Sequence, residues 1–479
     1  MLAATGLRLP YPEIIAALGR VFAEHGRCLY LVGGPVRDLL LGRQPPDLDF
    51  TTDARPDEVK GFVRRAGAGE VYTVGEKFGT IGAIFRPGAD QPPLSVEITT
   101  YRSETYRPYS RKPRVEFGQS LLGDLSRRDF TINALALDVT GAEADGVGEL
   151  IDPYDGQRDL AHRLVRAVGD PDERFAEDPL RLLRAVRFAT QLDFRLDPDT
   201  AAALERRASE LAWIPKERVQ PELNRILLPE RVGEGICKLC DLGLMQHLVP
   251  ELLEMRGMHE DTFRHKDVFE HTLRVVEAVS PDLVLRWAAL LHDIAKPRTR
   301  SVEHGEVRFH RHELVGRQMS RAILSRLKYP RQLVEQVARL VELHLRPNSY
   351  EPDWTDGAVR RLMREAGDEL ERLLQLSRAD VTSRRAERRL AADRRVDELQ
   401  ARCAALQAQA DVAKLTSPLN GLELMEMFGR GPGPWIRPIK DRLTELVVDG
   451  ELAMDDKRRA ADIARQLVAS AESRTNDES

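Results

Sequence analysis

The chain has 479 residues, of which 42% are hydrophobic and 31% charged, and its net charge is −5. This length exceeds one ordinary domain, and the composition suits several folded domains. No apolar run approaches the roughly 20 residues that cross a bilayer. The four cysteines are too few for a disulfide scaffold. We therefore expect a reduced, multidomain, cytoplasmic protein. The charge excludes a polycation, but not nucleic-acid binding through local basic clusters.

The first 140 residues alternate between strand and helix patterns. CLYLVGG (28–34) is a short apolar run that ends in two glycines, and VRDLLLG (36–42) is typical of a helix. DLDFTT (47–52) and LSVEITTYR (94–102) indicate strands, and VYTVGEKFGTIGAIF (71–85) indicates a hairpin. This part of the chain predicts a small α/β domain with a mixed sheet and helices.

After about residue 150 the strand patterns end. Apolar residues then recur at helical spacing, as in DPLRLLRAVRFATQL (178–192) and VEQVARLVELHL (334–345). We expect this remainder to be almost entirely helical. The predicted domains are an α/β head (1–150), an all-α neck (151–250), a helical body (251–385) and a helical tail (386–479).

Asp47 and Asp49 lie two residues apart on an expected strand, so their side chains face the same way. Two adjacent carboxylates repel each other unless a cation lies between them. Upstream, Gly33 and Gly34 end a strand at the start of a helix, where free backbone N–H groups bind phosphate, and Arg37 can add a contact. Mg²⁺ prefers a few carboxylates together with phosphate oxygens. The pattern predicts an Mg²⁺ site beside a phosphate site.

Glu97 alternates with Val96 and Ile98, so it faces the opposite side of its strand. If this strand neighbours that of Asp47 and Asp49, three carboxylates could hold two metals. One metal would activate an attacking hydroxyl, and the other would stabilise a departing pyrophosphate. Two alternatives stay open: a solvent-facing role for Glu97, and a simple turn at the aspartate pair.

Three motifs resemble, in order and content, the class II tRNA nucleotidyltransferase and poly(A) polymerase family. They are GGPVRD…DLDF (33–50), RRDFTINALALD (127–138) and DPDERFAEDPLRLLRAVRFA (170–189). The resemblance implies transfer of a nucleoside monophosphate from ATP or CTP to an RNA 3′-hydroxyl. It also implies roles for six residues: Mg²⁺ binding by Asp47 and Asp49, triphosphate binding by Gly34 and Arg37, and contact with the phosphate and ribose by Arg128 and Asp129.

Asp178 and Arg181 are three residues apart on an expected helix and would share a face, which Arg184 and Arg187 continue. A carboxylate accepts from an exocyclic amine, and a guanidinium donates to a neighbouring acceptor. Cytosine and adenine both offer an amino group next to an acceptor, whereas uracil and guanine present a carbonyl and an N–H instead. Such a pair would select C and A without a nucleic-acid template. The alternative is a surface ion pair worth a few tenths of a kcal/mol.

Eight of the eleven histidines fall between residues 259 and 344. An adjacent His292-Asp293 pair within an apolar helix is costly to bury without a cation. Neutral imidazoles with carboxylates suit Mn, Fe, Ni, Zn or Mg. The pattern resembles the HD phosphohydrolase superfamily. That resemblance implies one metal bound by His271, His292, Asp293 and Asp380, and a second bound by His312 and His344.

The sequence thus predicts an enzyme of RNA 3′ ends. The leading hypothesis is addition of CCA to tRNA from CTP and ATP, joined by a phosphatase or phosphodiesterase activity if the HD domain is active. The alternatives are a poly(A) polymerase and an HD hydrolase with a degenerate head. The expected partners are tRNA or other RNA 3′ ends, contacted in part by the helical tail, with no membrane and no obligate protein partner.

Overall fold

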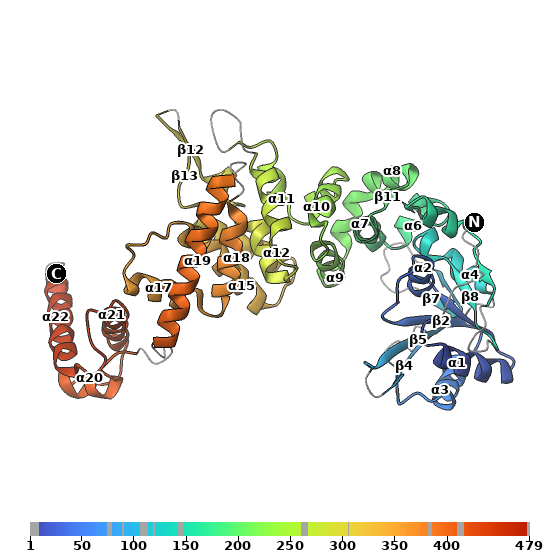
Figure 1. Cartoon of the computed structure of the whole chain (residues 1–479), viewed down its shortest axis with the longest axis horizontal. Coiled ribbons are helices and arrows are strands. Elements are labelled where there is room, and N and C mark those ends of the chain that lie inside the picture. Colours follow the sequence, from blue (N-terminus) through green and yellow to red (C-terminus); the bar gives the residue numbers. More distant parts are fainter. Residues whose placement is uncertain are drawn as a thin grey trace. The chain divides into compact units, whose positions relative to one another are not determined.

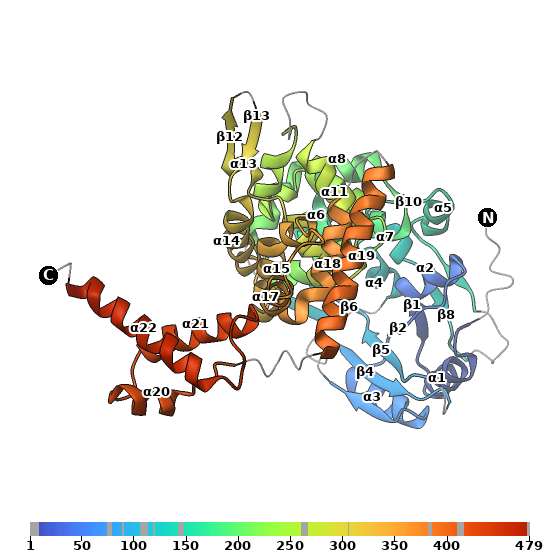
Figure 2. The same cartoon turned by 60° about the vertical axis from the view of Figure 1, so that its left-hand side comes forward.

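The structure is a computed structural model (Figures 1 and 2). It describes residues 9–73, 79–88, 91–105, 114–117, 120–141, 148–259, 267–304, 306–381, 386–409 and 416–476. The chain divides into two compact units, Met1–Pro250 and Glu251–Ser479. The finer division into four domains stays a prediction. Of the helices described, none combines the length and the apolar character that crossing a bilayer requires.

A seven-stranded sheet with the order β3-β4-β5-β2-β1-β8-β9 organises the first part of unit one. β2 and β5 run parallel and the other neighbours antiparallel, which confirms the predicted mixed sheet. β3 and β4 pair as the predicted hairpin, of which residues 74–78 lie outside the described residues. The strands are Leu29–Val32 (β1), Leu48–Thr52 (β2), Glu70–Tyr72 (β3), Thr80–Phe85 (β4), Leu94–Thr100 (β5), Ala136–Asp138 (β8) and Leu150–Ile151 (β9).

The helices of the head pack beside this sheet. α1 (Pro12–Glu24) and α3 (Pro56–Arg65) contact each other, and α3 also contacts β4 and β5 (Figure 1). Every second residue of β5 is buried, so one face of that strand belongs to the core and the other can carry polar groups. The remaining elements are α2 (Gly34–Leu40), α4 (Leu121–Ser126) and the strand pair β6 (Arg102–Thr105) and β7 (Arg114–Phe117).

Helices follow the sheet within the same unit. Their starts are encoded locally: the side chains of Asp170 and Asp197 accept from the backbone N–H groups of Glu173 and Thr200, which are otherwise unpaired at a helix start. α7 packs against α9 and α10. These helices are α5 (Gly156–Ala161), α6 (Pro171–Glu177), α7 (Leu180–Leu192), α8 (Pro198–Arg207), α9 (Lys216–Leu227) and α10 (Val232–Asp241).

Unit two is built mainly from helices, with α15 packed against α12 and α14. Trp287 lies fully buried, with its ring edge to face with Tyr329. The helices are α11 (Val268–Ala278), α12 (Leu283–Leu291), α13 (Lys296–Thr299), α14 (His312–Arg326), α15 (Arg331–Leu343), α16 (Leu345–Asn348), α17 (Asp356–Ala366), α18 (Leu370–Asp380) and α19 (Ala386–Gln409). Last come α20 (Gly421–Phe428), α21 (Ile436–Val448) and α22 (Lys457–Asn476) (Figure 2). Buried residues of these three helices form a small apolar core.

The prediction of an almost entirely helical remainder after residue 150 is confirmed, with a few short strands among the helices. β10 (Leu164–Val165) pairs with β11 (Arg195–Leu196), and β12 (Arg300–Glu303) pairs with β13 (Glu306–Phe309). Two-residue strands are too short to show a period. β12 and β13 carry no fully buried residue, so no apolar alternation marks them.

Candidate functional site

Three carboxylates meet at the parallel pair of the sheet. Asp49 on β2 is the register partner of Glu97 on β5, so both side chains emerge on the same face. Asp47 lies two residues earlier, just before β2 begins. All three line one cavity of about 1830 Å³ within unit one, hereafter the cavity. The condition that the sequence left open, adjacency of the two strands, is therefore met.

The electrostatics of these acids call for a cation. Burial raises the pKa of Asp49 to about 6, with further increases from Asp47 and Glu97 and a decrease from Arg128. The Asp49 carboxylate is therefore disfavoured while the three acids face one another without a positive charge between them. A divalent ion would relieve both the repulsion and the desolvation. The donor set, all carboxylate oxygens, fits Mg²⁺.

Gly33 precedes α2 with φ of +74°, a conformation that side chains rarely adopt. A Cβ atom there would lie 2.5 Å from Nη1 of Arg128, so a larger residue would also displace this guanidinium. Gly34 starts the helix, and the buried Arg37 donates to Oδ1 of Asn133 over 2.8 Å. Gly34, Arg37 and Arg128 also line the cavity. The structure thus brings the predicted phosphate-binding residues to the carboxylates.

Asp129 is buried and accepts from Nδ2 of Asn133 and from Nε of Arg184, at 3.1 and 2.7 Å. Burial alone would raise the pKa of Asp129, but Arg184 and these hydrogen bonds lower it to about 2. This carboxylate is therefore ionised at any physiological pH. Its hydrogen bonds connect the segment after α4 with α7 and hold the Arg184 side chain at the cavity wall.

Sequence reasoning missed Glu222 and Phe188, which hold Arg187. Arg187 donates through Nη1 to both carboxylate oxygens of Glu222, at 3.0 and 2.7 Å, and both residues are about 95% buried. The Phe188 ring lies 4.2 Å from the Arg187 guanidinium carbon, and the guanidinium groups of Arg37 and Arg184 also lie over this ring. Arg187 therefore supports the cavity wall. Glu222 lies on α9, 35 residues away in sequence, so no local pattern signals the pairing.

The prediction that Asp178 and Arg181 share one helix is wrong. Asp178 is extended between α6 and α7, because the following Pro179 disfavours the helical conformation of the residue before it. The two side chains do not pair, which also removes the alternative of a simple ion pair. Asp178 contacts Arg218 at 2.7 Å, and Arg181 contacts Glu177 at 2.6 Å. All four nevertheless line the cavity.

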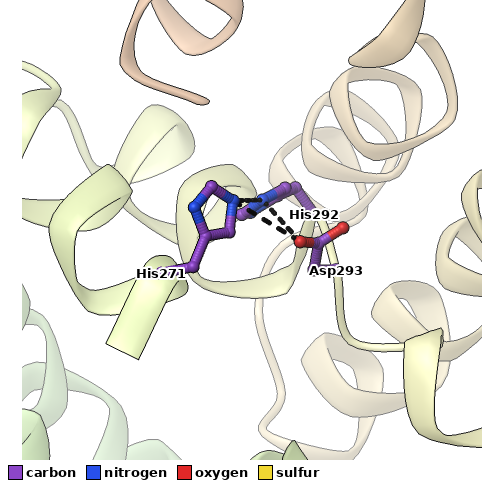
Figure 3. A group of neighbouring side chains, drawn as sticks. All are labelled: His271, His292 and Asp293. Carbon is purple, nitrogen blue, oxygen red and sulfur yellow. Dashed lines mark hydrogen bonds and ion pairs between the residues drawn. The ribbon is translucent and has the colours of Figure 1, made fainter. Parts of the chain in front are cut away.

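A second cluster lies in unit two, where His271, His292 and Asp293 converge (Figure 3). Nε2 of His292 lies 3.3 Å from Nε2 of His271 and 3.2 Å from Oδ2 of Asp293. Oδ1 of Asp380 completes this group, 3.0 Å from Nε2 of His271. On the other side, Oδ1 of Asp293 lies 3.5 Å from Nε2 of His312 and 4.0 Å from that of His344.

All six predicted residues therefore meet, and Asp293 joins the two groups, which we call the histidine–aspartate cluster. The expected helical placement is wrong in detail. α12 ends at Leu291, so His292 and Asp293 occupy the turn after it.

The backbone selects the metal-binding form of three imidazoles. Nδ1 of His292, His312 and His344 lies 2.8, 3.1 and 2.7 Å from the carbonyl oxygens of Ala289, Phe309 and Val341. A carbonyl only accepts, so each Nδ1 carries a hydrogen, and each ring in its neutral form turns the lone pair of Nε2 toward Asp293. Outer partners of this kind orient metal-binding histidines. The donor set fits a divalent metal.

The charges of the buried groups in this cluster also suit a bound metal ion. Burial would lower the pKa of His292, but Asp293 and Asp380 raise it to about 10. Lys296, which the sequence analysis missed, lies 2.7 Å from Oδ2 of Asp293 and helps lower the pKa of that carboxyl. Burial lowers the pKa of His344 to about 4. Without a metal, a protonated imidazole and an ammonium group balance the buried carboxylates.

Three known domain families match successive parts of the chain. Residues 29–166 match the family described as "Poly A polymerase head domain", 193–255 the "Probable RNA and SrmB-binding site of polymerase A", and 268–385 the "HD domain". An "A-adding tRNA nucleotidyltransferase" of Deinococcus radiodurans is 34% identical and covers 90% of this chain and 94% of its own length. A "CCA-adding enzyme" of Geobacillus thermodenitrificans is 33% identical and covers 93% and 96%.

A solved structure shares the architecture. The "CCA-adding enzyme in complex with CTP" of Bacillus stearothermophilus superposes with a TM-score of 0.68 at 26% identity, covering 97% of this chain and 99% of its own. Identity of a third or more over nine-tenths of both chains leaves no doubt about ancestry. This chain belongs to the tRNA nucleotidyltransferase and poly(A) polymerase family, in a form that carries an HD domain.

Proposed function

We propose that this chain adds the CCA end to tRNA, using CTP and ATP, in the cavity of unit one. The observation that carries the proposal is the register of Asp49 with Glu97, which sets three carboxylates beside the Gly33–Arg128 contact. A relative named as a CCA-adding enzyme covers nearly the whole chain, which supports this reaction, whereas a relative named as an A-adding enzyme makes addition of the last adenosine alone the result to test against.

In this proposal Asp47, Asp49 and Glu97 hold Mg²⁺, which when bound lowers the pKa of the RNA 3′-hydroxyl and neutralises charge on the reacting phosphate. Gly33, Gly34, Arg37 and Arg128 bind the triphosphate. Asp129 and Arg184 contact the nucleotide and keep the wall in place. Asp178, oriented by Arg218, accepts from the exocyclic amine of cytosine or adenine, and Arg181 and Arg187 hold this region in shape.

The proposal is tested by extension of three tRNA transcripts that lack CCA, CA or A, with CTP alone, ATP alone or both. CCA addition gives two cytidines with CTP alone and stops after one further adenosine when ATP is present. Extension of only the transcript that lacks A would instead assign an A-adding enzyme, as the Deinococcus relative is named. Open-ended adenosine tails would assign a poly(A) polymerase. Either result would overturn the proposal.

We infer a second activity, metal-dependent hydrolysis of phosphate esters at RNA ends, for the histidine–aspartate cluster. The supporting observation is that three rings have Nδ1 on a backbone carbonyl and Nε2 directed toward the shared Asp293. Each group offers two histidines together with Asp293, and such nitrogen-containing sets suit Mn²⁺, Ni²⁺, Fe²⁺ or Zn²⁺ better than Mg²⁺.

Metal analysis of the purified protein, followed by assays on RNA with 2′,3′-cyclic or 3′-phosphate ends, tests this activity. Asp293→Asn should abolish hydrolysis and leave tRNA extension intact, whereas Asp49→Ala should do the reverse. A folded protein that binds none of these metals and hydrolyses neither end would contradict the inference. Hydrolysis without any extension by the wild-type chain would favour the alternative of a degenerate head.

A further inference from the structure

Trp213 is an exposed tryptophan at the wall of the cavity. It ends the 3₁₀ helix Ala208–Trp213, and 65% of its surface is exposed, although tryptophan is largely buried in most proteins. The other three tryptophans each pack against an aromatic ring: Tyr329, Tyr350 and Phe428. Within the part of the chain that the structure describes, no ring packs on Trp213.

The backbone around Trp213 is nevertheless well anchored. Leu211 is fully buried and Ile214 nearly so, and the N–H of Ile214 donates to the carbonyl of Leu211 over 3.3 Å. Pro215 then leads into α9. The indole is thus held out on a fixed turn. A rigid flat ring loses little conformational entropy when another ring stacks on it.

The surroundings of the indole are those of a nucleotide-binding site. Trp213 lines the same cavity as Asp178 and Arg218. Arg218 follows Trp213 by five residues in the sequence. The cavity also contains the three carboxylates where chemistry is proposed. Bases stack on aromatic rings of this kind, and stacking accepts every base because each has a π face.

We propose that Trp213 is a stacking platform for the 3′-terminal base of the RNA acceptor, a positioning role that rests on the proposed function. The incoming nucleotide already has its phosphates and its base edge assigned to other residues. The acceptor differs at each addition, because its last base is first that of the unextended tRNA and then cytosine. Stacking does not depend on which base is present, so it suits an acceptor whose last base changes. The indole is also exposed to solvent, so an RNA can reach it.

Steady-state kinetics test the role with Trp213→Ala, the conservative Trp213→Phe, and Leu122→Ala as a matched control that is 57% exposed but does not line the cavity. Trp213→Ala should raise KM for tRNA lacking its last A by roughly 5- to 100-fold. KM for ATP and kcat should stay within about twofold. Trp213→Phe should restore most of the loss, and the control should behave as wild type. An unchanged KM for tRNA, or a rise in KM for ATP instead, would overturn the proposal.

A binding measurement separates this proposal from the function on which it rests. In the Asp49→Asn background, which removes turnover, tRNA lacking CCA should quench tryptophan fluorescence, and Trp213→Phe should abolish that quenching. CTP or ATP alone should quench little. Quenching by free nucleotide equal to that by RNA, or quenching that survives Trp213→Phe, would refute the stacking role. If wild-type protein extends no tRNA, the proposed function fails, whereas extension with no effect of Trp213 removes only this inference.

Discussion

Asp49 and Glu97 are register partners across the parallel strands β2 and β5, and burial with this crowding raises the pKa of Asp49 to about 6. The ionised Asp49 carboxylate therefore destabilises the folded protein when no metal is bound. Asp49→Asn should lower kcat at least about 100-fold, because the metal supplies several kcal/mol of transition-state stabilisation. The same change should stabilise the metal-free protein at pH 8 by on the order of 1–3 kcal/mol.

Thermal melting in EDTA checks the stability effect, with Asp57→Asn as a control at an exposed aspartate outside the cavity. A lower melting temperature for Asp49→Asn than for wild type at pH 8 would contradict the argument. Mg²⁺ should raise the melting temperature of wild type and leave that of the variant nearly unchanged.

The raised pKa of Asp49 also predicts a pH dependence. The ordinary pKa of this carboxyl is 3.8, so between about pH 4 and 6 the folded chain holds a proton that the unfolded chain has lost. Its contribution to stability is present below pH 4 and is lost as pH rises through 6. Mg²⁺ competes with this proton, so the Mg²⁺ concentration for half-maximal extension should increase as pH falls from 7.5 to 5.5. A constant Mg²⁺ requirement over that range would argue against Asp49 as a ligand.

The Arg187–Glu222 pair predicts a purely structural defect. Glu222→Gln leaves the Arg187 guanidinium buried beside Phe188 without its counter-charge, which should cost about 3–5 kcal/mol of unfolding free energy. The matched control is Arg206→Gln, which breaks an exposed ion pair with Asp172 and should change stability little. Urea unfolding of both variants checks the difference. Equal changes in the free energy of unfolding for the two variants would contradict the argument that the buried pair stabilises the fold more than the exposed pair does.

Much of the first site was readable from the sequence because its signals are local. The spacing of Asp47 and Asp49, the glycines before a helix and the alternation around Glu97 each lie within a few residues, and one strand adjacency joins them. In the second site, residue type marked the clustered histidines and the adjacent His292-Asp293 pair. The full set of six candidate ligands came from the resemblance to the HD phosphohydrolase superfamily.

The sequence could not reveal partners that are distant in the chain. Glu222 holds Arg187 from 35 residues away in the chain. Local backbone also overrode helical periodicity where Pro179 interrupted the pattern. Trp213 looked like any scattered tryptophan, because exposure depends on packing between elements and not on sequence spacing.

Asp178 should determine which bases are accepted. Its carboxylate only accepts hydrogen bonds, whereas an asparagine can also donate to the O4 carbonyl of uracil. Asp178→Asn should therefore raise the ratio of UTP to CTP incorporation, by roughly tenfold for one exchanged hydrogen bond. Glu210→Gln, which neutralises another carboxylate of the cavity, is the control. Single-nucleotide extension with each triphosphate measures the ratio, and an unchanged ratio would remove Asp178 from base selection.

Metal binding at the histidine–aspartate cluster should release protons. The pKa of His292 is raised to about 10 without a metal, so this ring is protonated at pH 7 and must lose its proton to become a ligand. His344, with its pKa lowered to about 4, is already neutral and releases none. Affinity for Mn²⁺ or Ni²⁺ should therefore increase with pH between 6 and 9. Calorimetric titration at pH 7 in buffers of different ionisation enthalpy should count about one proton released when the first metal ion binds.

His310→Ala, at an exposed histidine paired with Glu303, should leave this proton count unchanged, whereas His292→Ala should abolish both metal binding and proton release. Tight binding without proton release would mean that His292 is not a ligand.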